Sequence, residues 1–113
     1  LRKIAADFLR TLGYRVVAAR NGDDALALFR EKPGEIDMAL LDIAMPGMNG
    51  LDVYHEIKKV RPDIDVLFMT GYSLDAANIS TIQNQGISII RKPFTMTALA
   101  RRIREILDKE KTV

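Results

Sequence analysis

Three polar residues follow short apolar runs in this sequence, and together they suggest phosphate chemistry. Asp42 ends one run, Thr70 ends a second, and Lys92 follows a third. A carboxylate can act as a nucleophile and form an acyl phosphate. A threonine hydroxyl can donate a hydrogen bond to a phosphoryl oxygen, and a lysine ammonium can neutralise the charge on that group. Pairing with Lys92 would keep the carboxyl group of Asp42 ionised, as a nucleophile or a metal ligand requires.

Each of these residues also has an ordinary structural explanation. An aspartate after a strand usually caps a helix or forms a turn. A threonine there is usually only the strand end, and a lysine before a proline is unremarkable. The phosphate interpretation is favoured because the three residues end successive strands. If those strands are parallel neighbours, the side chains converge at one edge of the sheet.

The elements that must position these residues alternate between strand and helix patterns. Short apolar runs predict strands at residues 14–19, 38–41, 66–69 and 87–90. Helical spacing predicts five helices. The first covers residues 1–12 and the fourth covers 73–85. The second begins at a cap at Asp23, the third follows Asn49, and the fifth begins at a cap near Thr97. Gly13 is a natural end for the first helix. This order predicts an α/β fold with a doubly wound parallel sheet, in which the run at 38–41 is buried on both faces.

Length and composition exclude several classes of protein. The 113 residues, 48% hydrophobic and 28% charged, fit one globular domain and argue against disorder. Without cysteine there are no disulfides, thiolate metal sites or cysteine nucleophiles, and a single histidine, His55, excludes multi-histidine sites within the chain. We expect His55 to face solvent on the helix that follows Asn49.

The charge pattern and the apolar runs bear on partners and location. The net charge is +2, and the basic residues are interleaved with acidic ones, which favours a solvated helix face over a nucleic-acid partner. No apolar run approaches the ~20 residues that span a bilayer, and no signal peptide is visible. We therefore expect no membrane association and a cytoplasmic location.

Three segments of the chain resemble the receiver domains of two-component response regulators. Residues 40–50, LLDIAMPGMNG, resemble the phosphoacceptor strand and loop of that family. Residues 68–72, FMTGY, resemble its switch-threonine strand end. Residues 90–94, IRKPF, resemble its lysine motif, in which the Lys-Pro bond is typically cis. The spacings of 28 residues from Asp42 to Thr70 and 22 from Thr70 to Lys92 are normal for the family. The resemblance implies one receiver domain over residues 1–113 with the flavodoxin-like fold.

The resemblance also implies a phosphotransfer role. Asp42 would accept a phosphoryl group from a histidine kinase or a histidine phosphotransfer protein. Thr70 would move to meet a phosphoryl oxygen, and Lys92 would pair with the group. Gly71 would leave room for the phosphoryl group and contribute a backbone N–H.

The metal and the loops of the site follow from the same resemblance. Mg²⁺ would be bound by Asp42, by the backbone carbonyl of Ala44, and by an acidic pair. Pro46 and Gly50 would shape the loop after Asp42, and Pro93 would shape the loop after the lysine.

The beginning of the chain departs from the family pattern. Receivers start with a hydrophobic strand that ends in the acidic pair, whereas this sequence starts within the first helix, where Asp7 cannot replace the pair. We therefore expect weak Mg²⁺ binding and slow phosphorylation. In the strand order 2-1-3-4-5 the absent strand is central, so we do not expect an ordinary receiver monomer. A strand from another chain, a rearranged sheet and an incomplete sequence remain alternatives.

A second departure concerns the aromatic residue that usually lies three residues before the lysine. Here that position is Ile89, so the usual coupling of a ring to the threonine shift is in doubt. Tyr72 either shields the site or is an ordinary loop residue.

The sequence therefore predicts a phosphorylatable signalling switch rather than a turnover enzyme. Its output would be a change on the face formed by the fourth helix, fifth strand and fifth helix. It resembles the C-terminal receiver of a hybrid sensor kinase, and a stand-alone regulator is the other arrangement. The alternative function is a pseudo-receiver or inactive fragment that acts only as a docking or oligomerising module.

Overall fold

A three-stranded parallel sheet forms the centre of the chain in the computed structural model, which describes residues 2–19, 21–42, 50–71, 84 and 87–109. The strands are β1 (Met38–Asp42), β2 (Asp65–Thr70) and β3 (Ser88–Arg91), in the order β1-β2-β3. The helices are α1 (Arg2–Thr11), α2 (Gly22–Glu31), α3 (Gly50–Val60) and α5 (Met96–Lys109), with a short 3-10 helix, η1 (Pro33–Glu35). The predicted α/β parallel fold is confirmed, while the helix predicted over 73–85 falls, except for Asn84, on residues outside the described ranges.

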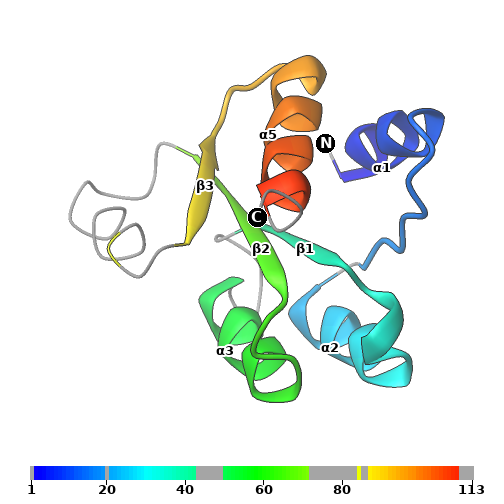
Figure 1. Cartoon of the computed structure of the whole chain (residues 1–113), viewed down its shortest axis with the longest axis vertical. Coiled ribbons are helices and arrows are strands. Elements are labelled where there is room, and N and C mark those ends of the chain that lie inside the picture. The colour runs from blue at the N-terminus through cyan, green and yellow to red at the C-terminus, as the bar shows by residue number, and fades with distance from the viewer. Residues whose placement is uncertain (1, 20, 43–49, 72–83, 85–86, 110–113) are drawn as a thin grey trace.

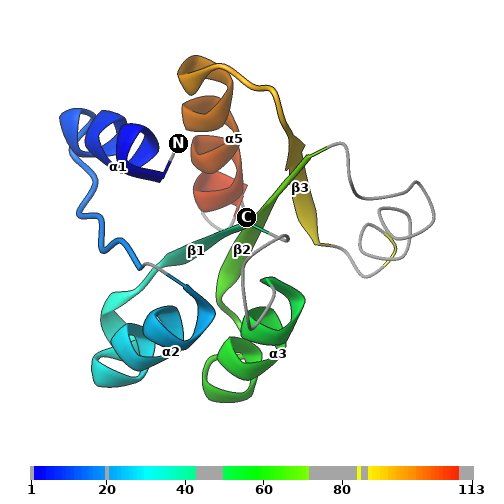
Figure 2. The same ribbon diagram turned by 180° about the vertical axis from the view of Figure 1, so that it is seen from behind.

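The helices cover the sheet in two layers (Figure 1). One layer, α1 and α5, packs on one face, and the other, α2 and α3, packs on the opposite face. Figure 2 shows the same division from behind. Alternate residues of β2 serve the two faces, because Val66 and Phe68 join the α2/α3 core and Leu67 joins the α1/α5 core.

Burial differs between the strands, and the prediction of a fully buried first run was wrong in part. The central strand β2 contains Leu67 and Phe68, both 0% exposed. In β1 only Leu41 is buried, and Met38 to Leu40 are half-buried. The reason is position, because β2 has a strand on each side whereas β1 pairs only with β2 among the described residues.

The strand predicted at 14–19 does not form. The segment has no helix or strand assignment, and it connects α1 to the residues before α2. Tyr14 and Val16 pack against the α1/α5 core, whereas Val17 is 61% exposed. Its apolar composition suits a strand, but a strand also needs a neighbour. In the described sheet, β1, β2 and β3 pair only with one another.

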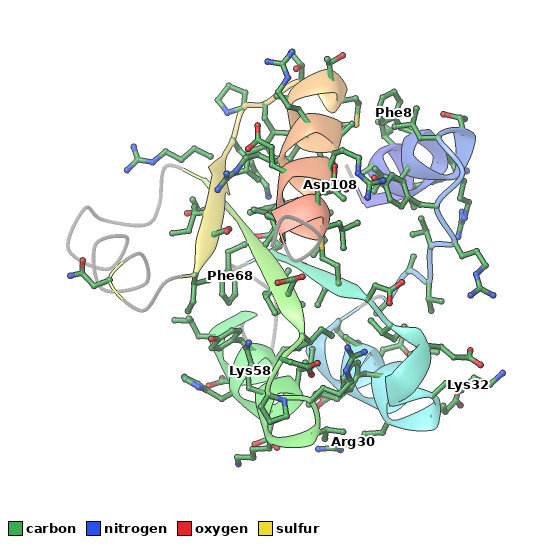
Figure 3. All side chains as sticks on the ribbon, in the orientation of Figure 1. Phe8, Arg30, Lys32, Lys58, Phe68 and Asp108 are labelled. Carbon is green, nitrogen blue, oxygen red and sulfur yellow. The ribbon has the colours of Figure 1, made fainter. Side chains whose placement is uncertain are left out.

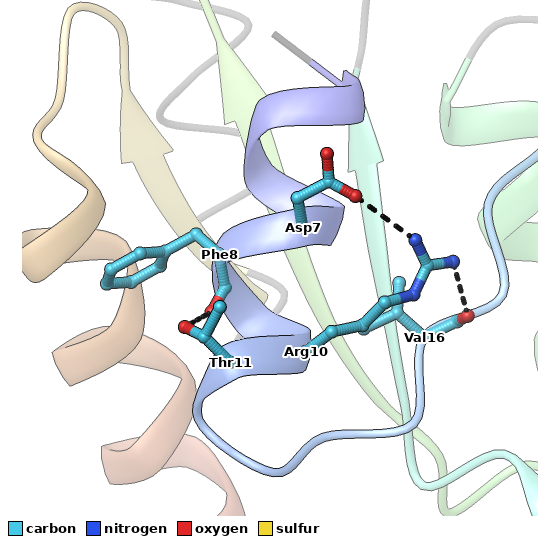
Figure 4. Close-up of polar contacts among 5 residues, drawn as sticks. All are labelled: Asp7, Phe8, Arg10, Thr11 and Val16. Atoms are coloured by element: carbon cyan, nitrogen blue, oxygen red, sulfur yellow. Dashed lines mark hydrogen bonds and ion pairs between the residues drawn. The ribbon is translucent and has the colours of Figure 1, made fainter.

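Polar contacts hold this segment against α1 (Figure 4). Arg10 donates hydrogen bonds to Val16 O, at 3.0 Å, and to the carboxylate of Asp7, at 3.3 Å. Asp7 is therefore engaged by Arg10 on the surface of α1. Tyr14 also contacts α5, because its hydroxyl accepts a 3.4 Å bond from Arg104. A hydrogen bond from Arg104 to Asp108 and the proximity of Tyr14 raise the pKa of Arg104.

Two helix caps lie earlier in the chain than predicted. The N-cap of α2 is Asn21, whose side chain accepts a 2.8 Å bond from the backbone N–H of Asp24, and Asp23 is already inside the helix. At the start of α5, the hydroxyl of Thr95 accepts a 3.0 Å bond from the N–H of Ala98. Each capping side chain lies three residues before the backbone N–H that it binds. The predicted caps, Asp23 and Thr97, lie two residues further along the chain and are already inside their helices.

Two basic side chains of the α3 C-terminal region fix this helix to the sheet. Arg61 donates to Ile36 O, just before β1. Lys58, labelled in Figure 3, donates to Pro62 O at 3.0 Å and to Ile64 O at 2.9 Å. These contacts hold the end of α3 against the residues that precede β1 and β2.

Replacing Phe68 should test the central position of β2. Phe68→Ala removes a ring that is 0% exposed and that contacts Tyr54, at 5.6 Å between centroids. We expect the free energy of unfolding to fall by about 3–5 kcal/mol in urea titrations, a large part of the ~5–15 kcal/mol typical of a domain. The control is Ile4→Ala, at a side chain 61% exposed, which should change it by less than about 0.5 kcal/mol. Similar losses in both variants would contradict this assignment of the core.

Candidate functional site

Asp42, Thr70 and Lys92 lie where the three strands end. Asp42 is the last residue of β1, Thr70 is the last residue of β2, and Lys92 directly follows β3. The parallel register sets Asp42 beside Met69 and Thr70 beside Arg91. The three residues therefore occupy one edge of the sheet, as their positions after successive apolar runs suggest.

Lys92 links the three strand ends. Its backbone N–H donates a 2.7 Å hydrogen bond to Thr70 O on β2. Its side chain crosses to β1, where Nζ lies 2.5 Å from Oδ2 of Asp42. One residue is thus tied to β2 through its backbone and to β1 through its ammonium group.

The Lys92–Asp42 pair is partly open to solvent. The side chains are 30% and 29% exposed, so both charges keep some hydration. The ammonium offsets the carboxylate charge, and the carboxylate remains accessible to a small reactant. An accessible carboxylate beside a cation is an arrangement that suits attack on a phosphoryl group.

Thr70 is the most buried of the three residues, at 1% exposed. Its hydroxyl makes a long bond of 3.4 Å to the carbonyl oxygen of the adjacent Gly71. A Cβ built on Gly71 would meet nothing within 4 Å, so there is open space beside the end of β2. The Thr70 hydroxyl is therefore buried at this edge and makes only a long hydrogen bond among the described residues.

The other predicted site residues are only partly described. Pro93 follows Lys92 through a cis peptide bond, as the resemblance implies. Gly50 is buried and begins α3. Ala44 and Pro46 lie outside the described residues.

The described residues do not form a complete set of protein ligands for Mg²⁺. No group of three or more His, Cys, Asp or Glu side chains in it could hold a metal ion. Mg²⁺ commonly binds one or two carboxylates and retains several waters. Asp42 is the carboxylate at this edge, and Lys92 already pairs with it. The described residues therefore do not fit a metal site built by the protein alone.

Ile89 stands three residues before Lys92, where receiver domains usually carry an aromatic residue. Ile89 is half-buried, packs on the α2/α3 core and lies opposite Phe68 in the register of β2 and β3. Phe68 in turn contacts Tyr54 of α3. The contact between the Phe68 and Tyr54 rings was not predicted from the sequence, although Phe68 lies two residues before Thr70 on the same strand. His55 is exposed, as predicted, and its ring contacts Tyr54 edge-on.

A parallel α/β sheet with polar residues at its carboxyl edge defines a broad class of ligand-binding domains, and comparison with known proteins narrows it. The sequence matches the profile of the response regulator receiver domain over residues 1–104. The chain therefore belongs to the receiver domain family of two-component systems. No helix in the described ranges is long and apolar enough to cross a membrane.

Individual relatives agree with this assignment. The chain is 34% identical over 102 residues to the sensor kinase CckA of Brucella abortus, covering 90% of this chain and 11% of that protein. It resembles the structure of a response regulator receiver domain protein from Clostridium thermocellum at 29% identity and a TM-score of 0.88, covering 97% of this chain and 87% of that one. The structure of the receiver domain of the hybrid histidine kinase CckA matches at 28% identity and a TM-score of 0.77, covering 94% and 88%.

The chain spans only part of most curated relatives. It covers between 11% and 41% of the length of the first three. The family assignment therefore concerns the receiver domain and not the activities of those longer proteins.

The coupling between Asp42 and Lys92 can be measured with a double-mutant cycle. Asp42→Asn, Lys92→Met and the double variant should give a coupling free energy of about 1 kcal/mol in urea unfolding at low salt. The value is modest because each side chain remains about 30% exposed. A coupling of ~3 kcal/mol or more would contradict this account, since it would indicate a buried pair.

Proposed function

We propose that Asp42 is the phosphoacceptor of this receiver domain, and that phosphorylation there switches its conformation to control a partner or output. The observation that carries the proposal is the 2.5 Å contact of the Lys92 ammonium with the Asp42 carboxylate at the end of β1. Reaction requires an attacking oxygen, and the Asp42 carboxylate is 29% exposed, so it can be reached by a phosphoryl donor. Attack of Asp42 on phosphorus forms the acyl phosphate and displaces the donor's histidine nitrogen.

Three neighbouring residues would stabilise the phosphoryl group. The Lys92 ammonium would pair with one phosphoryl oxygen as negative charge accumulates next to β1. The Thr70 hydroxyl would exchange its long contact to Gly71 O for a phosphoryl oxygen, with Gly71 supplying space and a backbone N–H. Because these groups end adjacent strands, the sheet holds them in position before the reaction begins.

Magnesium has a limited role in this proposal. Receiver domains generally bind Mg²⁺ at the phosphorylation site, where the ion neutralises phosphoryl charge. In this chain Asp42 and the carbonyl of Ala44 would be its protein ligands, and we propose that binding is weak because the described residues supply one carboxylate. Pro46, Gly50 and Pro93 would shape the loops around the site.

The donor would be a histidine kinase or a histidine phosphotransfer protein, since receiver domains interact with these proteins. The similarity to CckA supports a role as the receiver of a hybrid sensor kinase in the cytoplasm.

We assign residues 1–113 to this one domain, with self-catalysed phosphorylation and dephosphorylation as its only chemistry. Its output would involve β3 and α5, and we also propose that copies of the chain self-associate.

A pseudo-receiver is the second candidate function. It is favoured by the poor metal fit of the described residues, because weak Mg²⁺ binding would slow phosphorylation. Such a domain would only dock or oligomerise.

Intact mass after incubation with acetyl phosphate and Mg²⁺ tests the proposal. We expect one added phosphoryl group, which Asp42→Asn abolishes because its amide is not a nucleophile. Asp52→Asn is the control, since Asp52 is an exposed acid in the first turn of α3 and should leave the added mass unchanged. No added mass in the parent protein would support the pseudo-receiver. Phosphorylation that survives Asp42→Asn would refute the assignment.

A magnesium titration tests the expected weak binding. The rate of phosphorylation should rise with Mg²⁺ without saturating at concentrations of about 1 mM, since one carboxylate paired with lysine attracts the ion poorly. Saturation at micromolar Mg²⁺ would contradict this, and would indicate further acidic ligands at the site.

A further inference from the structure

A cavity of about 120 Å³ lies at the amino edge of the sheet, where β2 and β3 begin. Its lining comes from α3, from α5 and from the beginnings of these two strands. Asp65, the first residue of β2, belongs to this lining and lies five residues before Thr70. At about 3.3 Å per strand residue, the two ends of β2 are roughly 16 Å apart. The cavity is therefore separate from the proposed phosphorylation site.

One part of the cavity lining is apolar and buried. It consists of branched aliphatic side chains that are each less than 10% exposed: Ile64, Val66, Ile87 and Ile106. Such a surface binds an apolar group, and an apolar cavity of about 150 Å³ in another protein holds benzene. A cavity of about 120 Å³ therefore fits a short aliphatic group.

The ammonium group of Lys58 is held at a fixed place on this lining (Figure 3). It donates hydrogen bonds to Pro62 O at 3.0 Å and to Ile64 O at 2.9 Å, and it lies 5.7 Å from the centre of the Tyr54 ring. An ammonium group has three N–H donors, so these two bonds leave one donor for a ligand. A carboxylate is the acceptor that suits it, because a charge-assisted hydrogen bond is stronger than a neutral one.

Asp65 and Ser88 add an acceptor and a hydroxyl to the same cavity. Both side chains are half-buried, and neither makes a hydrogen bond or an ion pair with the described residues. The Asp65 carboxylate and the Lys58 ammonium thus line one cavity without pairing with each other. A ligand that carries both charges can satisfy both groups, whereas a ligand with one charge leaves the other group without a partner.

We propose that this cavity binds a small aliphatic amino acid. The carboxylate of the ligand accepts a hydrogen bond from Lys58, its ammonium group donates to Asp65, and its side chain packs on the buried aliphatic residues. The hydroxyl of Ser88 serves either charged group of the ligand. The two carbonyl bonds to Lys58 hold its ammonium group in place before the ligand arrives, which lowers the entropic cost of binding.

Titration of the ¹⁵N-labelled chain with L-valine, followed by NMR, tests the site. We expect saturable shifts of the backbone amide signals of Asp65 and Ser88. Isovalerate is valine without the ammonium group, and isobutylamine is valine without the carboxylate. Each should bind about tenfold more weakly or worse, because it leaves one charged group of the cavity without a partner. No saturable shift with valine, or equal affinity for either analogue, would overturn the proposal.

Two pairs of variants locate the binding site. Asp65→Asn should weaken valine binding about tenfold, whereas Asp63→Asn makes the same change outside the cavity, at a side chain 81% exposed, and should not. Lys58→Met should weaken binding to a similar degree, with Lys59→Met as its control at a side chain 71% exposed. Lys58 also holds the end of α3, so thermal unfolding is measured for each variant, and the aspartate pair decides if Lys58→Met unfolds early. Equal losses of affinity in the two aspartate variants would overturn the proposal.

Discussion

The contact between the Lys92 ammonium and the Asp42 carboxylate joins the two outer strands of the described sheet across the end of the middle one. It depends on the parallel order β1-β2-β3, because only parallel strands bring these ends to one edge. The hydrogen bond from Lys92 N to Thr70 O fixes the lysine to β2 as well. The site depends on the order of the sheet, which holds a carboxylate, an ammonium group and a hydroxyl at one edge.

The two helix layers determine how firmly this edge is held. β2 is buried between them, with Leu67 facing α1 and α5 and Phe68 facing α2 and α3. β1 carries the proposed nucleophile but is less buried and has an open outer edge in the described structure. Among the described strands, the one that carries the proposed nucleophile is thus an outer strand and is less buried than β2.

Sequence patterns were sufficient for the elements that carry local signals. The runs that became β1, β2 and β3 end in polar residues, and helical spacing located α1, α2, α3 and α5. The strand predicted at 14–19 was wrong because a short apolar run indicates which residues become buried and not whether a neighbouring strand is present to pair with them. The caps at Asn21 and Thr95 were missed because several residues near each helix start can cap it, and the backbone decides which one does. The bond from Lys92 N to Thr70 O has no sequence signal, since it depends on strand register.

Borohydride reduction of the phosphorylated chain, followed by peptide mass mapping, tests the central claim most directly. Borohydride converts an aspartyl phosphate to homoserine and leaves phosphoesters and free carboxylates unchanged. The account predicts homoserine at position 42 and nowhere else, because Asp42 is the carboxylate that lies beside Lys92 at the strand ends. Homoserine at another aspartate, or phosphate retained on a hydroxyl side chain, would contradict it.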